Sequence, residues 1–95
     1  MANICENTIY CSSKSATDIR MIKQFLDENF ETYDSGYNDD YMDMKFSSKW
    51  EFPEKEMREM TSRLEDKENA NIRVTSIEWG NGYIATHVFR NGEWR

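Results

Sequence analysis

Two cysteines and one histidine offer the most direct chemistry in this chain. Nucleophilic catalysis would need a Cys or Ser beside a base, and His87 is the only histidine. Cys5 and Cys11 cannot form a disulfide with each other, because six residues of extended chain separate them by about 20 Å. A small enzyme with a Cys–His site remains an alternative only if the strands that carry these residues are neighbours. The alternative is two buried, apolar thiols and a half-buried structural histidine.

Metal and cofactor sites are not predicted. The chain has no C-x-x-C motif, and the calcium-loop pattern fails because Gly36 follows Asp34 by only two residues. The glycine-rich phosphate-binding and dinucleotide-binding motifs and the G-x-S-x-G motif do not occur either. We therefore expect no cofactor, no metal and no enzymatic activity.

The negative charge of the chain is concentrated in one stretch. The net charge is −6, and residues 27–43 contain seven acids and no Lys or Arg, which leaves eleven acids against twelve bases elsewhere. A field of this sign repels phosphates and attracts basic surfaces, so direct nucleic-acid binding is not expected. The stretch is open to three interpretations: a solvated loop, a surface for a basic protein partner, or a cation site.

Tyrosines are interleaved with these acids, and tyrosine is enriched among the anchor residues of protein interfaces. We therefore predict a partner-binding surface of four aspartates and two tyrosines, namely Asp34, Tyr37, Asp39, Asp40, Tyr41 and Asp43. Tyr10, Tyr83 and Phe89 are a separate candidate, because RNA-binding sheets stack bases on aromatic residues of an open face. The lack of a basic patch argues against that use.

The elements that must position these residues follow from hydrophobic periodicity. Alternation over residues 5–11 and residues 41–48 predicts two half-buried strands, the second of them central. Ser15 opens a capping-box spacing, and apolar residues then recur at helical intervals, which predicts a helix over residues 16–30. Residues 31–40 contain turn formers without a period, so this part of the acidic stretch is predicted to be a loop.

The second half of the chain predicts one more helix and two further strands. Pro53 suits a first helical turn, and the apolar stripe that follows predicts a helix ending near Lys67. The strand over residues 72–79 changes its apolar parity, which indicates either a bulge near Thr75 or partial cover of both faces. Glycine-containing turns then predict a hairpin, a returning strand over residues 83–89 and a short last strand or tail.

Together these elements predict an α+β fold in the order β-α-β-α-β-β. The expected architecture is a ferredoxin-like two-layer sandwich, in which an antiparallel-rich sheet carries two helices on one face. The length predicts a single domain, 1–95. No apolar run approaches the roughly 18 residues that cross a bilayer, and the first residues lack signal-peptide features. We therefore expect a cytoplasmic protein without membrane contact, and a homodimer through the open sheet face is a further alternative.

Three segments resemble a known family. The opening N-I-C-E-N-T-I, residues 3–9, resembles the N-W-C-x-N-x-L start of YubB-like ferredoxin-like domains of phage and plasmid proteins. F-S-S-K-W-E-F-P, residues 46–53, is similar to their strand-to-helix segment, and Trp79 with residues 82–85 resembles their last hairpin. Ile4 stands where the family has its first Trp, and the segment before the central strand is compressed into the acidic stretch. The resemblance implies a ferredoxin-like sandwich from a mobile element and implies no reaction.

The charge distribution and this resemblance lead to one functional hypothesis. The chain is predicted to be a non-enzymatic, acidic interaction protein of phage or mobile-element origin. Its partner would be the basic surface of a host protein that handles nucleic acid, such as a restriction or CRISPR component, which an acidic mimic would inhibit. The Cys–His enzyme and a homodimeric module of unknown role are the alternatives.

Overall fold

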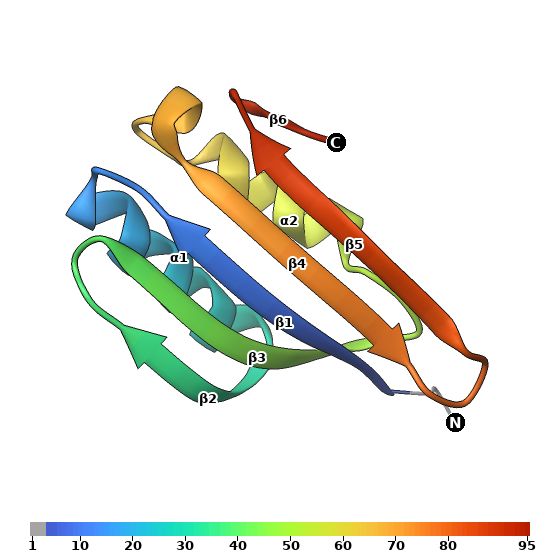
Figure 1. The fold of residues 1–95 in the computed structure, drawn as a ribbon. Helices are drawn as coiled ribbons and strands as arrows, with labels where there is room; N and C mark the ends of the chain where they lie inside the picture. Colours follow the sequence, from blue (N-terminus) through green and yellow to red (C-terminus); the bar gives the residue numbers. More distant parts are fainter. Residues whose placement is uncertain (1–3) are drawn as a thin grey trace.

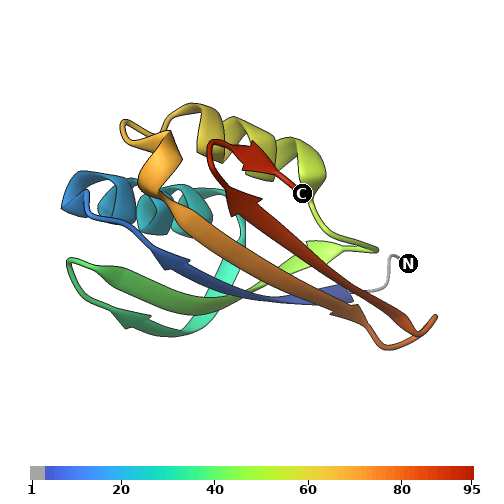
Figure 2. The ribbon, with the colours of Figure 1, turned by 45° about the horizontal axis from the view of Figure 1, so that its top comes forward.

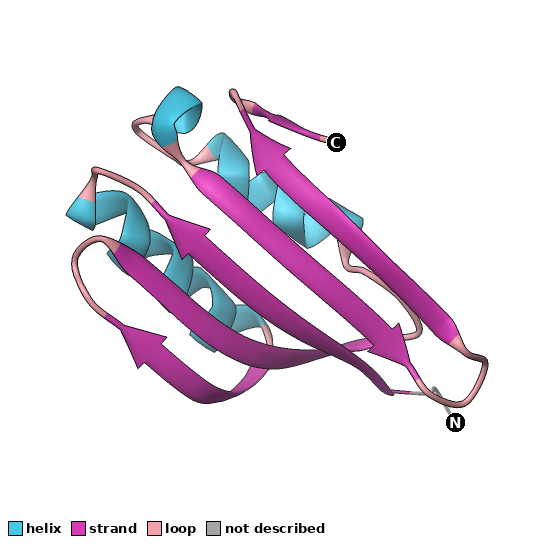
Figure 3. Cartoon of the chain, in the orientation of Figure 1, coloured by secondary structure: helices cyan, strands magenta, loops and turns pink. Residues whose placement is uncertain are grey.

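The computed structural model describes residues 4–95, which form an α+β fold with one six-stranded antiparallel sheet and two α-helices (Figure 1). The strands lie in the order β2-β3-β1-β4-β5-β6 (Figure 1), and Figure 3 distinguishes the strands of this sheet from the helices by colour. Both helices cover the same face of the sheet, as predicted (Figure 2). In chain order the elements are β1 (Ile4–Ser12), α1 (Ala16–Asn29), β2 (Glu31–Tyr37), β3 (Tyr41–Lys49), α2 (Glu54–Ser62), a 3-10 helix (Lys67–Asn69), β4 (Asn71–Glu78), β5 (Tyr83–Arg90) and β6 (Glu93–Trp94).

The centre of the sheet is β1, which pairs with β3 on one side and with β4 on the other. Burial alternates along β1, so that Ile9 faces the helices while Tyr10 faces the open side. The register places Ile9 between Met44 and Val74, and all three side chains are buried in one core. The period of two in the sequence is confirmed for β1 and β3.

The start of α1 confirms the predicted cap and adds a tertiary contact. Ser15 Oγ accepts a hydrogen bond from the Asp18 N–H at 3.1 Å. The Asp18 carboxylate does not return the bond to Ser15, as a capping box would require. It accepts instead from the backbone N–H groups of Glu65 and Asp66, both at 2.9 Å. One buried carboxylate thus joins the start of α1 to the segment that leaves α2.

The loop predicted for residues 31–40 is wrong over most of its length, because Glu31–Tyr37 forms the edge strand β2. The pairing with β3 is interrupted between Tyr33 and Gly36, and Asp34 there takes a positive φ of 51°. A bulge accommodates turn-forming residues within a strand, and β3 supplies backbone partners that local propensity does not anticipate. The order is therefore β-α-β-β-α-β-β-β, which corrects the predicted β-α-β-α-β-β.

Helix α2 ends at Ser62, earlier than the predicted limit near Lys67. A longer helix would direct the N–H groups of Glu65 and Asp66 to its own carbonyls, but these groups are bonded to Asp18. A buried acceptor from another helix therefore overrides local helix propensity.

Strand β4 keeps one register with β1 and β5 along its described residues, so the bulge considered near Thr75 does not form. The parity changes in the sequence because polar residues, Ser76 and Glu78, lie on the buried face. Ile77 is half-buried on the open face. Partial cover of both faces is therefore the correct alternative.

The core lies between the sheet and the two helices. The helices contribute buried apolar side chains at helical spacing, namely Ile19, Ile22, Phe25 and Leu26 from α1 and Met57 and Met60 from α2. Burial of each such side chain stabilises the fold by roughly 1.5–3 kcal/mol. Among residues 4–95, neither helix has the length and apolar character needed to cross a membrane.

Candidate partner-binding surface

The six predicted partner-binding residues lie on one hairpin, which β2, β3 and the turn between them form (Figure 1). We call residues 31–49 the acidic hairpin. It stands at an edge of the sheet, because β2 pairs with no strand other than β3 in the described part of the chain. The six are placed as follows: Asp34 at the bulge, Tyr37 at the end of β2, Asp39 and Asp40 in the turn, and Tyr41 and Asp43 on β3.

The hairpin divides these residues between its two faces. Tyr41 and Asp43 alternate with buried residues of β3 and face the open side of the sheet. Tyr37 pairs with the buried Met42 and therefore faces the helix side, where it lines a shallow groove with α1. The structure thus places Tyr41 and Asp43 on one face of the hairpin and Tyr37 on the other.

The turn of the hairpin is held by hydrogen bonds to the Asn38 side chain and from the backbone of Ser13. Asn38 Oδ1 accepts from the N–H groups of Asp40 at 2.8 Å and Tyr41 at 3.0 Å. The Ser13 N–H donates to the Asp40 carbonyl at 3.0 Å, which ties the turn to the loop between β1 and α1. The turn carboxylates are therefore carried by an ordered backbone, which reduces the entropy that binding would cost.

The carboxylates of the turn and of β3 lack cationic partners. No Lys or Arg nitrogen of residues 4–95 lies within 4.0 Å of the carboxylates of Asp39, Asp40 or Asp43. Lys45 approaches Asp34 at 3.9 Å, and both side chains are exposed. An exposed pair of this kind contributes roughly 0–1 kcal/mol. The negative field of the hairpin is therefore largely uncompensated.

Gly36 determines where the Asp43 carboxylate can lie. The two residues are directly opposite each other across β2 and β3. A Cβ added to Gly36 would come within 2.5 Å of Asp43 Oδ1. The carboxylate therefore occupies the space that a side chain at position 36 would need. The glycine lets Asp43 extend over β2 toward the edge of the sheet.

A tyrosine pair adjoins the carboxylates on the open face. The rings of Tyr10 and Tyr41 stack with centroids 6.2 Å apart and an interplanar angle of 23°. The Arg73 guanidinium lies over the Tyr10 ring, 5.7 Å from its centroid. The sequence proposed Tyr41 as a contact residue but did not indicate its pairing with Tyr10, because the two come from different strands.

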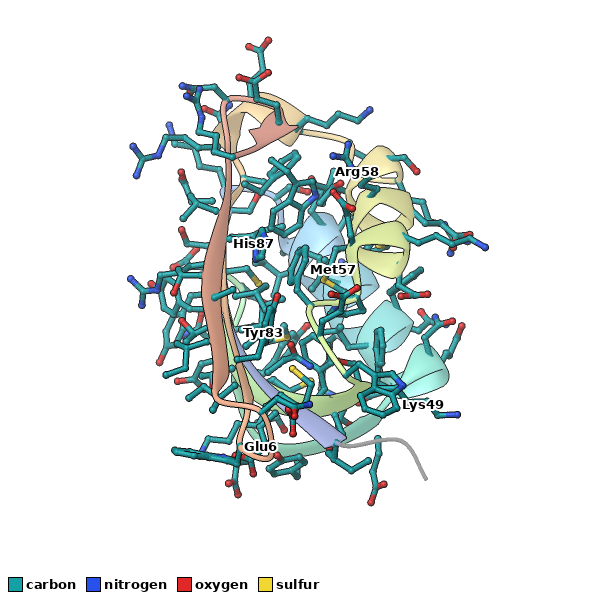
Figure 4. All side chains as sticks on the ribbon, turned by 90° about the vertical axis from the view of Figure 1, so that its right-hand side faces the viewer. Glu6, Lys49, Met57, Arg58, Tyr83 and His87 are labelled. Atoms are coloured by element: carbon teal, nitrogen blue, oxygen red, sulfur yellow. The ribbon has the colours of Figure 1, made fainter. Side chains whose placement is uncertain are left out.

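The alternative aromatic set is not on one face. Tyr10 is on the open side, whereas Phe89 is buried in the core between sheet and helices. Tyr83 also extends toward the helix side of the sheet (Figure 4). The set Tyr10, Tyr83 and Phe89 therefore cannot form a single base-stacking platform.

Protein-family models, curated proteins and solved structures contain no match to this chain. The resemblance to YubB-like domains stays a prediction. Asn3, the first residue of the segment that opens this resemblance, lies outside the described residues.

The Cys–His pair does not form in this fold. Strand β4 lies between β1, which carries both cysteines, and β5, which carries His87. The His87 ring stacks on Phe52 instead, with centroids 3.8 Å apart. Burial raises the pKa of Cys11 to about 12, and burial and the nearby Glu78 carboxylate raise the pKa of Cys5. A raised pKa disfavours the thiolate, so neither cysteine has the character of an activated nucleophile.

Asn7, on the covered face of β1, uses its side-chain hydrogen bonds within the fold. Asn7 Nδ2 donates to Ser48 Oγ at 2.9 Å and to the Phe46 carbonyl at 3.3 Å, and Asn7 Oδ1 accepts from Ser76 Oγ at 2.6 Å. This network joins three strands and leaves no group free for a ligand. In the part of the chain that the structure describes, no three His, Cys, Asp or Glu residues are grouped so as to hold a metal ion.

Proposed function

We propose that this chain is a non-enzymatic interaction protein whose acidic hairpin binds a basic protein surface. The partner of matching chemistry is a host protein that handles nucleic acid, because the hairpin carboxylates offer negative charge where that partner binds phosphates. The bound chain competes with DNA or RNA and inhibits its partner, as a mimic of the anti-restriction or anti-CRISPR type.

The observation that carries this proposal is the absence of compensating charge. Three carboxylates, those of Asp39, Asp40 and Asp43, are exposed within one hairpin, and no cation of the described chain pairs with them. Such a cluster is unfavourable for the isolated fold, since like charges repel one another. A basic partner removes this repulsion on binding.

The tyrosines of the hairpin support a protein as the partner. Tyr33 and Tyr41, which face the open side of the sheet with Asp43, expose 36% and 40% of their surface. Tyrosine gains a large contact area at low entropic cost, which makes it a frequent interface anchor. Carboxylates with tyrosines beside them offer both charge and apolar area, as a protein interface requires.

The strand order and the sequence resemblance bear on the fold family and the origin of the chain. The strand order β2-β3-β1-β4, with helices after β1 and β3, supports a ferredoxin-like sandwich that β5 and β6 extend. The resemblance to YubB-like domains supports a phage or plasmid origin. On this proposal the protein acts in the cytoplasm of the host, without contact to a membrane and without binding nucleic acid itself.

The test compares two triple variants of equal charge. D39N/D40N/D43N neutralises the hairpin, and E51Q/E54Q/E59Q neutralises three exposed glutamates on or next to α2. Each protein is immobilised, host extract is passed over it, and retained proteins are identified by mass spectrometry. We expect the wild type and the α2 variant to retain a nucleic-acid-binding protein that added duplex DNA or 0.5 M salt releases. The hairpin variant should retain at least about tenfold less.

Two results would contradict the proposal. Equal retention by the hairpin variant would show that these carboxylates do not bind the partner. Equal loss in both variants would show that net charge matters and the position of the charge does not.

A further inference from the structure

The two edges of the sheet differ in how well they are protected against pairing with another strand. At one edge, β2 carries Glu31, Asp34 and a bulge, which are features that discourage edge-to-edge association. At the other edge, β6 covers only the last residues of β5, since it pairs with Phe89 and Arg90. Residues 83–87, with the sequence Y-I-A-T-H, contain no charged residue, proline or bulge. We call these five residues the free edge.

The hydrogen-bond pattern shows which backbone groups of the free edge point outward. Val88 exchanges two backbone bonds with Arg95, on the side away from β4, at 2.7 and 3.4 Å. In an antiparallel ladder the N–H and C=O of a residue point to the same side, and this side alternates along the strand. Ile84 and Thr86 therefore direct their N–H and C=O groups outward, like Val88. No strand of residues 4–95 pairs with them on that side.

We propose that the free edge of β5 pairs antiparallel with the free edge of a second copy of this chain. With a two-fold axis at Ala85, Ile84 of one copy lies opposite Thr86 of the other. Each of the two equivalent Ile84–Thr86 pairs exchanges two backbone hydrogen bonds, so four bonds satisfy all the outward groups of both free edges. This inference does not rest on the function proposed for the acidic hairpin.

The side chains of the free edge are compatible with this register. Ile84, which is 68% exposed, gains a β-branched neighbour in Thr86 on the open face. The two Ala85 side chains meet at the axis and are small enough for close approach. No charge opposes a like charge, whereas an equivalent pairing of two β2 strands about Asp34 would bring two carboxylates together.

Two residues of the free edge with polar side chains, Tyr83 and His87, lie on its helix side (Figure 4). Tyr83 and His87 both extend from β5 toward the side on which Met57 of α2 lies (Figure 4). His87 Nδ1 is buried and has no hydrogen-bond partner, the only such side-chain atom found in residues 4–95. The register places Tyr83 of one copy directly opposite His87 of the other. A phenol and an imidazole are thus brought side by side at each end of the ladder.

Strand β6 limits the length of this ladder. Because Arg95 already occupies the outward groups of Val88, the pairing between copies ends at His87. A five-residue ladder is shorter than a typical permanent interface, so we expect a dimer that dissociates on dilution.

The register is tested by cysteine cross-linking. In this pairing the two Ala85 residues form a non-hydrogen-bonded pair, whose α-carbons lie about 4.5 Å apart and can be bridged by a disulfide. We expect A85C to form a covalent dimer under mild oxidation, because the native Cys5 and Cys11 are buried and do not compete. S35C on the opposite edge is the matched control and should stay monomeric. Cross-linking of A85C no faster than that of S35C would overturn the proposal.

A pair of charge variants tests the same register without cross-linking. In I84K/T86K each lysine faces a lysine of the other copy, whereas in I84K/T86E each lysine faces a glutamate. We expect the mass from light scattering to rise toward twice the monomer mass with increasing concentration for the wild type and I84K/T86E, and to stay at the monomer mass for I84K/T86K. Circular dichroism establishes that both variants are folded.

Two outcomes of the mass measurement would overturn the proposal. If the wild-type chain is monomeric at every concentration, the free edge does not pair with a second copy. Its partner would then be a strand of another protein. A dimer that I84K/T86K does not dissociate would be formed through another surface, such as the open face of the sheet.

Discussion

The buried carboxylates and the hairpin carboxylates of this chain differ in exposure and in hydrogen bonding. Asp18 and Glu78 are 1% and 2% exposed, and each accepts two backbone N–H groups, at 2.9 Å for Asp18 and at 2.7 and 2.8 Å for Glu78. The turn aspartates and Asp43 are exposed and have no cationic partner among the described residues. The first set satisfies backbone donors inside the fold, whereas the second set is exposed to solvent. A residue type alone therefore does not indicate a function; its bonding does.

The sharpest test of this contrast is the substitution Asp18→Ala. It leaves the N–H groups of Glu65 and Asp66 without their acceptor, and we expect the free energy of unfolding to fall by about 2–3 kcal/mol. Asp39→Ala is the matched control and should change it by less than about 0.5 kcal/mol. Urea denaturation measures both. Similar losses in the two variants would remove the distinction between bonded and unbonded carboxylates.

A smaller effect is expected from Gly36→Ala, which tests position without changing charge. The added methyl group displaces the Asp43 carboxylate, so partner binding should weaken by about tenfold, which corresponds to about 1.4 kcal/mol. Since the displaced group is exposed, the loss in unfolding free energy should stay below about 1 kcal/mol. Binding is measured on the partner captured by the wild type. Undiminished binding would mean that Asp43 need not lie over Gly36.

The parts of the fold that the sequence predicts well are those with local and strongly contrasted patterns. The apolar alternation of β1 and β3 and the Ser15 cap of α1 give such patterns, and the structure confirms them. The end of α2 and the strand β2 depend on partners distant in the sequence. Asp18 accepts hydrogen bonds from the N–H groups after α2, and β2 forms by pairing with the edge of β3. Local secondary-structure propensity therefore predicts the wrong structure at both places.

The sequence predicts where the candidate site lies in the chain but not which face of the sheet each of its residues points to. Charge composition is a property of the sequence, and it identifies the acidic hairpin directly. The bulge between Tyr33 and Gly36 inserts one extra residue, so Tyr33 faces the open side while Tyr37 faces the helices. The contact of Tyr10 with Tyr41 likewise depends on a register between strands that no local pattern specifies.

Asp27 is intermediate between the two sets of carboxylates, because it belongs to the acidic stretch but its carboxylate accepts hydrogen bonds from other side chains. Lys23 Nζ and Thr32 Oγ1 donate to its carboxylate at 2.8 and 2.6 Å, and these bonds hold the pKa of Asp27 below its ordinary value of 3.8. A carboxyl group with a lowered folded-state pKa stabilises the fold above its unfolded pKa. This contribution is lost as the pH falls through the folded pKa.

Asp27→Asn should therefore be slightly less stable than the wild type at pH 7, by less than about 0.5 kcal/mol because the side chain is exposed. The difference should shrink as the pH falls below 3.8 toward the lowered folded-state pKa. Urea denaturation of both proteins between pH 7 and pH 2 measures it, with Asp39→Asn as the unpaired control. A difference that does not change with pH would mean that the carboxylate charge contributes nothing, and Asp27 would then belong with the unbonded carboxylates of the hairpin.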